Sequence, residues 1–427
     1  MYSVAVLASL ALLVALLVWG FVPRHLASLL VMAILLVTGA VELGEVVEFV
    51  DWDVLALIFG MSIFTVYLEK SGFVDVVAGC VLRKVGDLRM LVFVLSMVSG
   101  LISLFLENVT VVLILAPVVF RIATVLGVDP AYVLVPVALA SNMAGSATMV
   151  GDPPAIITAG YLGLSFTDFI WYRGRPSMFF LTVIPMVLAC LTASAMVPRD
   201  AGSARRRDEP MTRSVDKVFL AETLFFLGAK VLLLSLRTAL RLPLSLAVLV
   251  GLGGLTLCRL IHGDRRSVAE SFRKGFEWRT LLFLTGVFVL SGAFAKHGLA
   301  KHLALQLVEL CGYELLSLTS FLVWFSVAVS AFIDNVPYVS MMLPVISSLS
   351  SMLSVDPATI AWALLLGATL GGNLTFIGAS ANVVAVRVLE KQGRRVSFAE
   401  FMRISVPFNT VSVVSGWILY ELLWILS

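Results

Sequence analysis

Glu107-Asn108-Val109-Thr110 and Asp334-Asn335-Val336-Pro337 are two versions of one short motif, about 227 residues apart in a chain of 427. Each version lies in an apolar stretch, and a proline (Pro117 or Pro344) follows ten residues after its acid. A carboxylate and an amide inside an apolar stretch are costly in lipid and usually mark an ion or substrate path. Their repetition in both halves is typical of secondary transporters whose site lies between two related halves.

The repeat continues in the same register beyond this motif. The matched positions are Asp129-Pro130-Ala131 with Asp356-Pro357-Ala358, Gly145 with Gly372, Thr148 with Thr375, and Gly151 with Gly378. Two departures matter, because Ala379 stands opposite Asp152 and Asn373 stands opposite Ser146. The two halves therefore cannot offer identical sites, and the first half carries more negative charge.

The composition excludes an ordinary soluble domain, since 60% of the residues are hydrophobic and only 13% are charged. Ten or more apolar runs approach the length of about 20 residues that a helix needs to cross a bilayer. The first run, residues 3–20, has no basic residue before Arg24, so we expect a retained span and not a cleaved signal peptide. The four cysteines are scattered without metal-ligand spacing, which favours apolar thiols packed inside the membrane.

The pattern predicts an all-α polytopic membrane protein with about ten transmembrane helices and two re-entrant hairpins. In the first repeat (1–198) the predicted spans are 3–20, 25–42, 53–69, 130–162 (interrupted) and 177–198, with a hairpin at 88–127. In the second repeat (217–427) they are 217–240, 243–261, 280–296, 357–386 (interrupted) and 404–426, with a hairpin at 313–354. A basic linker, 199–216, joins the two repeats.

The linker decides the predicted sidedness. Its arginines are Arg199, Arg205, Arg206, Arg207 and Arg213, and the positive-inside rule places them in the cytoplasm. Tracing outwards leaves most of the 30 Lys and Arg residues on the cytoplasmic side, while the acidic loop 42–51 falls outside. Because each repeat has an odd number of spans, the second enters the bilayer from the opposite side. The repeats are therefore predicted to be inverted, with both termini extracytoplasmic in the plasma membrane.

Amphipathic stretches recur at matching places and predict interfacial helices that lie flat on the membrane. Residues 71–85 and 296–311 follow the third span of each repeat, and residues 165–169 and 397–401 follow each interrupted span. Ordinary connecting helices are the alternative at these places.

The hairpin tips and interrupted spans hold the polar residues that we expect to bind an ion or substrate. Non-helical backbone survives at membrane depth only where it is buried in protein or lines a wet cavity. Broken helices can hold Na+ at their carbonyl ends or an anion at their amide ends, while carboxylates can exchange protons. Taken singly, such residues often pack helices together or form hydrogen bonds between them, but their matched repetition favours an ion or substrate site. The predicted site residues are Glu107, Asn108, Thr110, Asn142, Ser146, Thr148, Asp152, Asp334, Asn335, Asn373, Thr375, Ser380 and Asn382.

Two further charged residues, Glu222 and Lys230, lie eight residues apart in the span 217–240 and so on roughly one helix face. They predict either a cation near an anionic substrate or acid, or an internal pair, or a lysine that snorkels to the interface. All four histidines fall at span ends, where an interfacial position is expected, and none is placed as a proton relay.

These motifs resemble those of the ion transporter superfamily, which contains the arsenite pump membrane subunit, NhaD-type sodium–proton antiporters, the pink-eyed-dilution P protein and citrate or dicarboxylate carriers. The resemblance covers nearly the whole chain and is strongest to the P-protein and arsenite-permease-like branch. Besides the hairpin motifs, it is carried by Gly145-Ser146-Ala147-Thr148-Met149-Val150-Gly151-Asp152-Pro153-Pro154 and by Gly371-Gly372-Asn373-Leu374-Thr375-Phe376-Ile377-Gly378-Ala379-Ser380-Ala381-Asn382. It implies that the hairpin tips and broken helices enclose the substrate and coupling-ion sites, with H+ or Na+ as coupling ion and no cofactor.

The chain departs from the family pattern in two places. The first hairpin usually opens with Asp and here has Glu107, and Ala155 follows Asp152-Pro153-Pro154 where the family has Asn. Acidic tips of this kind argue for a cation or a neutral or weakly charged solute, and against a multivalent carboxylate.

We therefore expect a secondary active transporter that works by alternating access, and not an enzyme. Arsenite or another inorganic anion, moved with the help of H+ or Na+, is the favoured substrate; a sodium–proton antiporter and an organic anion carrier (citrate or dicarboxylate) are the alternatives. A channel or a receptor is the rival from another class, and neither needs two matched broken helices. Membrane lipid and a small ion or solute are the expected partners, with no nucleic acid; the resemblance leaves a homodimer and a soluble ATPase partner open.

Overall fold

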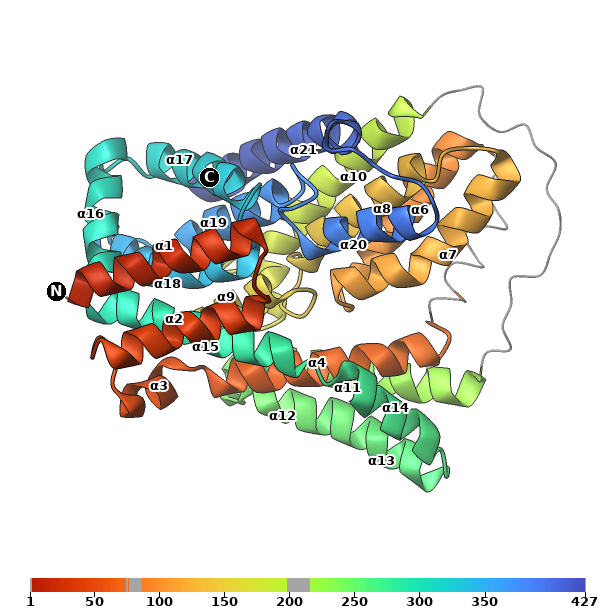
Figure 1. Ribbon diagram of the computed structural model, residues 1–427, viewed down its shortest axis with the longest axis horizontal. Coiled ribbons are helices and arrows are strands. Elements are labelled where there is room, and N and C mark those ends of the chain that lie inside the picture. Colours follow the sequence, from red (N-terminus) through yellow and green to blue (C-terminus); the bar gives the residue numbers. More distant parts are fainter. Residues whose placement is uncertain (1, 74–75, 77–86, 198–215, 427) are drawn as a thin grey trace.

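The computed structural model describes residues 2–73, 76, 87–197 and 216–426 (Figure 1). Within these ranges the chain is almost entirely helical, and the strands β1 (Trp171–Tyr172) and β2 (Arg175–Pro176) form one short antiparallel ribbon. The expectation of an all-α polytopic membrane protein is confirmed. The predicted linker, apart from Asp216, and most of the stretch 71–85 lie outside the described residues.

The helices follow the predicted order along the chain. In the first half they are α1 (Tyr2–Trp19), α2 (Arg24–Val37), α3 (Leu43–Phe49), α4 (Trp52–Lys70), α6 (Leu88–Ser103), α7 (Asn108–Leu126), α8 (Ala131–Gly145), α9 (Pro153–Leu162) and α10 (Met178–Met196). In the second half they are α11 (Lys217–Leu240), α12 (Leu244–Val248), α13 (Gly254–Ile261), α14 (Arg265–Gly275), α15 (Trp278–Lys296), α16 (Leu299–Cys311), α17 (Leu315–Ser330), α18 (Asn335–Leu353), α19 (Pro357–Gly371), α20 (Ser380–Lys391) and α21 (Phe398–Tyr420). A 3-10 turn (Thr167–Phe169) precedes β1, and π-helical turns join α12 to α13 (Leu249–Gly253) and end α21 (Glu421–Ile425).

Over the described part of the chain, eight helices are long and apolar enough to cross a membrane, and the bent pair α16–α17 would make a ninth span. Seven of the eight coincide with predicted spans, namely α1, α4, α10, α11, α12–α13, α14–α15 and α21. The eighth is α18, which the sequence predicts as one arm of a hairpin. The remaining predicted spans correspond to the shorter helix α2 and to the broken pairs α8–α9 and α19–α20.

Two predicted interfacial helices are wrong. Residues 165–169 form only a short 3-10 turn, and residues 397–401 belong to the start of α21. α21 begins this early because the side chains of Ser397 and Glu400 cap each other's backbone amides in a capping box. The stretch 296–311 is largely helical, as α16, whereas α14 was not predicted because its basic residues broke the apolar pattern.

The two broken helices form the centre of the fold. Nearly every residue of α8 and α19 is buried, which suits helices that are apolar on all sides. α9, from the first half, packs against α18 and α19, whereas α20, from the second half, packs against α7 and α8. Figure 1 shows this exchange, with α9 near the middle of the molecule beside α18 and with α20 beside α7 and α8.

Two matched ion pairs hold the ends of these broken helices. Arg394, which follows α20, contacts Asp129 just before α8 (Nη2 to Oδ2, 2.8 Å). Arg173, which follows α9, contacts Asp356 just before α19, and the Asp356 carboxylate also accepts a hydrogen bond from the Tyr172 hydroxyl (3.1 Å). Each broken helix thus ends where the other begins, so the two run antiparallel. Inverted repeats require this arrangement, although the repeat boundaries and the membrane side that each end faces stay predictions.

Replacing Arg394 by alanine is expected to lower the free energy of unfolding by ~1 kcal/mol or less, because water screens a pair that is about one-third exposed. The loss should shrink at high salt. Thermal unfolding of the purified protein at low and high ionic strength measures it, with Arg395→Ala as a matched exposed control. A melting temperature for Arg394→Ala that equals that of Arg395→Ala at low salt would contradict the prediction.

Candidate functional site

Both hairpins break at the acid–amide motif. Glu107 is the N-cap residue of α7, and Asp334 is the N-cap residue of α18. The Asp334 carboxylate accepts a hydrogen bond from the Val336 N–H (3.0 Å), whereas the Glu107 side chain caps nothing. N-cap side chains normally accept hydrogen bonds from the free amides of the first helical turn. The Glu107 carboxylate does not, so it is free to bind another group.

The two interrupted helices also break as predicted, between α8 and α9 and between α19 and α20. Matched hydrogen bonds hold each break against its own hairpin. Thr148 Oγ1 donates to the Leu104 carbonyl (2.5 Å), and Thr375 Oγ1 donates to the Ala331 carbonyl (2.5 Å). The repeat read from the sequence is therefore matched by equivalent contacts in both halves.

A glycine at the far end of each break allows a close backbone approach. A Cβ atom at Gly151 would overlap the carbonyl oxygens of Gly145 and Ser103. A Cβ atom at Gly378 would lie 2.7 Å from the Ser330 carbonyl oxygen. Both positions exclude any side chain because the backbone of the break lies directly against the hairpin.

Asparagine side chains join the two breaks across the halves. Asn142 Nδ2 donates to Asn373 Oδ1 (3.0 Å) and to the Thr369 carbonyl (3.3 Å). Asn373 Nδ2 donates in turn to the Leu139 carbonyl (2.9 Å), and Asn142 Oδ1 accepts from Asn108 Nδ2 (3.1 Å). Buried amides need such partners, so this crossing fixes where α8, α19 and the first hairpin tip meet.

A cavity of about 360 Å³, called here the central cavity, lies where these elements meet. The first residues of α7, α9, α18 and α20 all line it. Of the predicted site residues, it brings together Glu107, Asn108, Asn142, Asp152, Asp334, Asn335 and Ser380. The volume is at the small end of the range of about 300–1,000 Å³ that is usual for small-molecule sites.

The other predicted residues do not line the central cavity. Ser146, Thr148, Asn373, Thr375 and Asn382 are buried and bond to backbone carbonyls, and Thr110 lies half-buried in the first turn of α7. In this conformation the buried five hold the breaks in shape. Direct binding of an ion or substrate by any of the predicted residues stays a prediction.

Basic residues of the cavity were missed by the sequence analysis. Arg24, His25 and Arg279 line it, from the starts of α2 and α15. Arg24 forms an ion pair with Asp334 (2.5 Å) and donates to the Ser380 hydroxyl (3.0 Å). Basic residues at span ends predict ordinary interfacial anchors, so the available signal was weak. That signal was an arginine directly before the predicted span 25–42.

Basic and acidic groups therefore share the central cavity. Arg24 lies at the N-terminus of α20, whose N-cap residue, Ala379, has no side-chain oxygen to satisfy the free amides. Arginines and uncapped helix N-termini favour anions. Glu107 and Asp152 line the same cavity, and Asp152 is only 4% exposed. The arrangement can hold an anion and a cation at the same time.

A second cavity, of about 220 Å³, is lined by α9, α15 and α18. On each of these helices it lies one turn further along than the central cavity. The neighbouring residues that line the central and the second cavity are Pro154 and Ile157 on α9, Leu284 and Phe288 on α15, and Val336 and Ser340 on α18. Because a helical turn rises about 5.4 Å, the barrier between the two cavities is about one turn thick. In the predicted topology the central cavity faces the cytoplasm and the second cavity faces outside.

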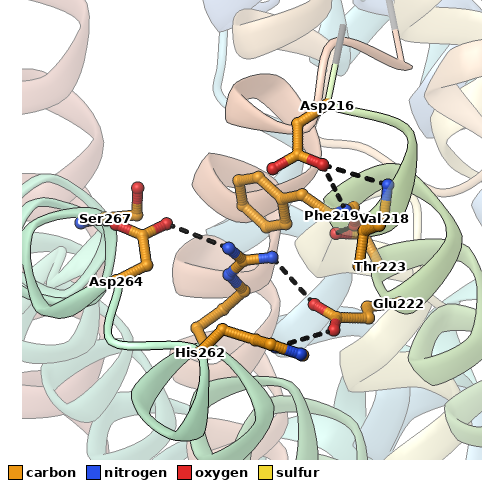
Figure 2. A network of polar contacts seen from close by, with 9 residues as sticks. Asp216, Val218, Phe219, Glu222, Thr223, His262, Asp264 and Ser267 are labelled. Carbon is orange, nitrogen blue, oxygen red and sulfur yellow. Dashed lines mark hydrogen bonds and ion pairs between the residues drawn. The ribbon is translucent and has the colours of Figure 1, made fainter.

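Glu222 belongs to a separate polar cluster, drawn in Figure 2. Its carboxylate contacts Arg259 (2.9 Å) and His262 (3.0 Å) at the end of α13. Arg259 also contacts Asp264 (3.3 Å), so the cluster joins α11 to the start of α14. Glu222 is therefore part of the packing between helices, away from the central cavity.

Lys230 is buried, at 2% exposure, and does not pair with Glu222. Its amine lies against Met61 Sδ (2.8 Å) and over the Phe64 ring (4.0 Å), both on α4. Among the residues that the structure describes, no carboxylate forms an ion pair with it. The predictions of an internal pair and of a snorkelling lysine are both wrong.

Comparisons with known proteins agree with this architecture. Residues 14–367 match the family described as "Citrate transporter". An uncharacterized transporter of Mycobacterium tuberculosis is 34% identical over 391 residues, which cover 88% of this chain and 87% of that protein. The P protein of Homo sapiens is 30% identical over 494 residues, covering 96% of this chain and 58% of the P protein.

Two solved transporters share the fold at low sequence identity. The YdaH transporter of Alcanivorax borkumensis has a TM-score of 0.61 and 16% identity, with 89% of this chain and 86% of that chain covered. MtrF of Neisseria gonorrhoeae, described with a class of antimetabolite efflux pumps, has a TM-score of 0.54 and 15% identity, with 88% and 82% covered.

The fold, the broken helices and these relatives define a multi-pass membrane transporter and not an enzyme. The chain belongs to the citrate transporter family. The resemblance to the ion transporter superfamily and to the P protein is confirmed. Substrate and coupling ion have to be argued from the site, since one fold serves many solutes.

Replacing Gly151 or Gly378 by alanine is expected to destabilise the protein by about 1–3 kcal/mol, the usual effect of overpacking, because each Cβ meets backbone carbonyls that cannot move away. Gly228→Ala is the matched control, since a Cβ there meets no atom within 4 Å. Thermal unfolding of the three purified variants in detergent makes the comparison. Wild-type melting temperatures for both Gly151→Ala and Gly378→Ala would contradict the close packing of the breaks.

Proposed function

We propose that this protein is a secondary active transporter that moves a small anion across the plasma membrane, coupled to H+ or Na+, by alternating access. The central cavity carries the proposal, because both hairpin tips and both broken helices border it and it holds arginines together with carboxylates. Inorganic anions such as arsenite come first among the candidate substrates, and organic anions such as citrate follow.

The anion would bind at Arg24, Arg279 and the uncapped N-terminus of α20. Asp334 pairs with Arg24 in the present conformation, so an incoming anion competes with Asp334 for the guanidinium. Asp334 stands at the tip of the second hairpin. A change of partner at Arg24 would therefore link substrate binding to movement of that hairpin.

The coupling cation would be held by Glu107 and Asp152. Glu107 forms no hydrogen bond or ion pair with any residue that the structure describes, and one Asp152 oxygen is occupied by the Ala155 N–H (3.1 Å). Uncompensated carboxylates away from water are costly, and a bound cation or proton removes that cost. Both residues come from the first half, which the sequence predicts to be the more acidic.

A sodium–proton antiporter is the second candidate. Asp334 already neutralises Arg24, so Glu107 and Asp152 are the cavity's carboxylates without an ion-pair partner among the described residues. An antiporter would alternate H+ and Na+ on these groups without an anion. The two candidates differ in whether an anion is needed for proton movement.

Proteoliposomes containing a pH-sensitive dye test the proposal when Na+, Li+, arsenite and citrate are added in turn. The expected result is a change of internal pH on addition of arsenite or citrate that saturates with concentration. If Na+ alone collapses an imposed pH gradient, the antiporter replaces the proposed function. Unsaturable flux without coupling to a second ion would indicate a channel.

Asp334→Asn is expected to reduce coupled flux by at least an order of magnitude without unfolding the protein. Asparagine keeps the oxygen that accepts from the Val336 N–H but loses the charge that pairs with Arg24. Asp216→Asn is the matched control, because Asp216 caps α11 in the same way but does not line the central cavity. Wild-type coupled flux from Asp334→Asn would remove this carboxylate from the mechanism.

Alternating access is supported by the thin barrier between the central and second cavities. Three helices, α9, α15 and α18, line both cavities one turn apart. A small rigid-body shift of these helices would open the second cavity to the site and close the first. The solute would then cross without a continuous pore.

Single cysteines on α15 are expected to show this alternation, in a background without the four native cysteines. Phe283 lines the central cavity and Ser291, two turns further on, lines the second cavity. A membrane-impermeant thiol reagent should label Phe283→Cys only from the cytoplasmic side and Ser291→Cys only from outside. Substrate should change both labelling rates, in opposite directions. Labelling of both positions from one side would contradict the predicted sidedness.

A further inference from the structure

A further helix break reaches the site, between α14 and α15. Residues Arg265–Lys296 together form one candidate span of 32 residues, yet the helix stops at Gly275 and resumes at Trp278. Glu277 is the N-cap residue of α15 at this break. Glu277 lies three residues before the predicted span 280–296, and the repeat comparison did not single it out.

Glu277 meets two carboxylates of the first half around a separate small cavity of about 30 Å³, called here the small cavity. Glu107 and Asp152 line both the central and the small cavity, whereas Glu277 lines only the small one. The Glu277 carboxylate accepts a hydrogen bond from the Thr280 hydroxyl (3.0 Å), and Thr280 lines both cavities. The small cavity is therefore bordered by the tip of the first hairpin, by the first broken helix and by the start of α15.

Two polar residues without hydrogen-bond partners among the described residues line the small cavity. Thr65 on α4 lines it and is 3% exposed, and its hydroxyl forms no hydrogen bond with any described residue. Glu107 likewise has no hydrogen-bond or ion-pair partner in the described part of the chain. Polar groups that lack protein partners beside a cavity can bind a water or an ion there. A cavity of this size can hold a water molecule in contact with several polar groups.

We propose that Glu277 is the proton-exchange partner of Glu107 and Asp152 and that the small cavity is the path of the coupling proton. This inference rests on the proposed function and names the route of its coupling ion. Like-charged carboxylates around one small cavity cannot cheaply remain ionised together, so one proton among them relieves the repulsion. A carboxyl group on the hairpin tip can thus exchange its proton with a fixed carboxylate on α15.

With one water in the small cavity as the carrier, the transfer balances without any other reactant. The O–H bond of the Glu107 carboxyl breaks as its proton joins the water, and the water gives a different proton to Glu277. Glu107 becomes the carboxylate, Glu277 becomes the acid, and the water is regenerated. The hairpin tip then carries a negative charge that opposes the anion, so proton transfer and anion release are linked.

Other titratable groups lie near Glu107 and Asp152 on the helices packed around them. Arg24 and His25 on α2, Arg279 on α15 and Asp334 on α18 line the central cavity that Glu107 and Asp152 share. On α11, the Lys230 amine contacts the sulfur of Met61, and Met61 lines the small cavity. Of these basic groups, only the Arg24 and Arg279 guanidiniums are permanently charged, and Arg24 already pairs with Asp334.

Two transport readouts on Glu277→Gln separate proton exchange from a structural role. The protein is reconstituted with citrate as probe, and with arsenite in a parallel arm. Exchange of labelled for unlabelled solute across the membrane moves no net proton, whereas net uptake driven by a pH gradient does. Glu277→Gln should keep exchange near the wild-type rate, lose the dye-reported proton movement and lose the pH dependence of net uptake. Glu277→Asp should recover part of the proton movement.

Glu421→Gln is the matched control, because Glu421 is also a buried glutamate, bonded to Thr319 and Ser320 and lining neither cavity. It should leave both readouts unchanged. Wild-type proton movement in Glu277→Gln would overturn the proposal, as would an equal loss of exchange and proton movement. Net uptake driven by Na+ instead of a pH gradient would also overturn it. If the wild type moves neither citrate nor arsenite, the proposed function fails first, and the two failures remain distinguishable.

Discussion

The fold depends on satisfying backbone and amide groups where helices stop inside an apolar interior. Each of the two interrupted helices leaves unpaired amides and carbonyls, which would be prohibitive in contact with lipid. The threonine of each break bonds to its own hairpin, and Asn142 and Asn373 bond across the halves. Only because these groups are paired can four helix N-termini surround one cavity instead of continuing as ordinary spans.

Chemical asymmetry is built into this symmetric frame. Thr148 and Thr375 make equivalent bonds, yet Asp152 caps α9 while the matched Ala379 leaves α20 uncapped. The acid of the second hairpin is paired with Arg24, whereas Glu107 of the first hairpin is unpaired among the described residues. In the proposed transport cycle, the symmetric frame would let the halves exchange positions. Under the proposed function, the unequal charges would give each half a different solute to bind.

Much of the fold could be predicted from sequence because its signals are local. The breaks at Gly145 and Gly372 and both hairpin tips lie where the repeat predicts them. Apolar length, glycine and N-cap acids each act within a few residues, so they can be read in order along the chain. The errors came from segments whose signal is weak or mixed. The 3-10 turn Thr167–Phe169 and the short ribbon after it interrupt an apolar stretch. The basic residues of α14 mask the helical pattern of that segment.

The sequence alone determined the membrane class, the two repeated motifs and the residues at which the helices break. The tertiary structure alone decided which polar residues line the central cavity and which only hold the breaks. It also decided that Arg24 pairs with Asp334 and that Lys230 contacts Met61. It further placed Glu277 and Glu107 around one cavity. These are contacts between segments that are distant along the chain. Local sequence preferences cannot encode these contacts, because the contacts form only when the helices pack together. Packing then has to supply partners for the few polar and charged groups in an apolar interior.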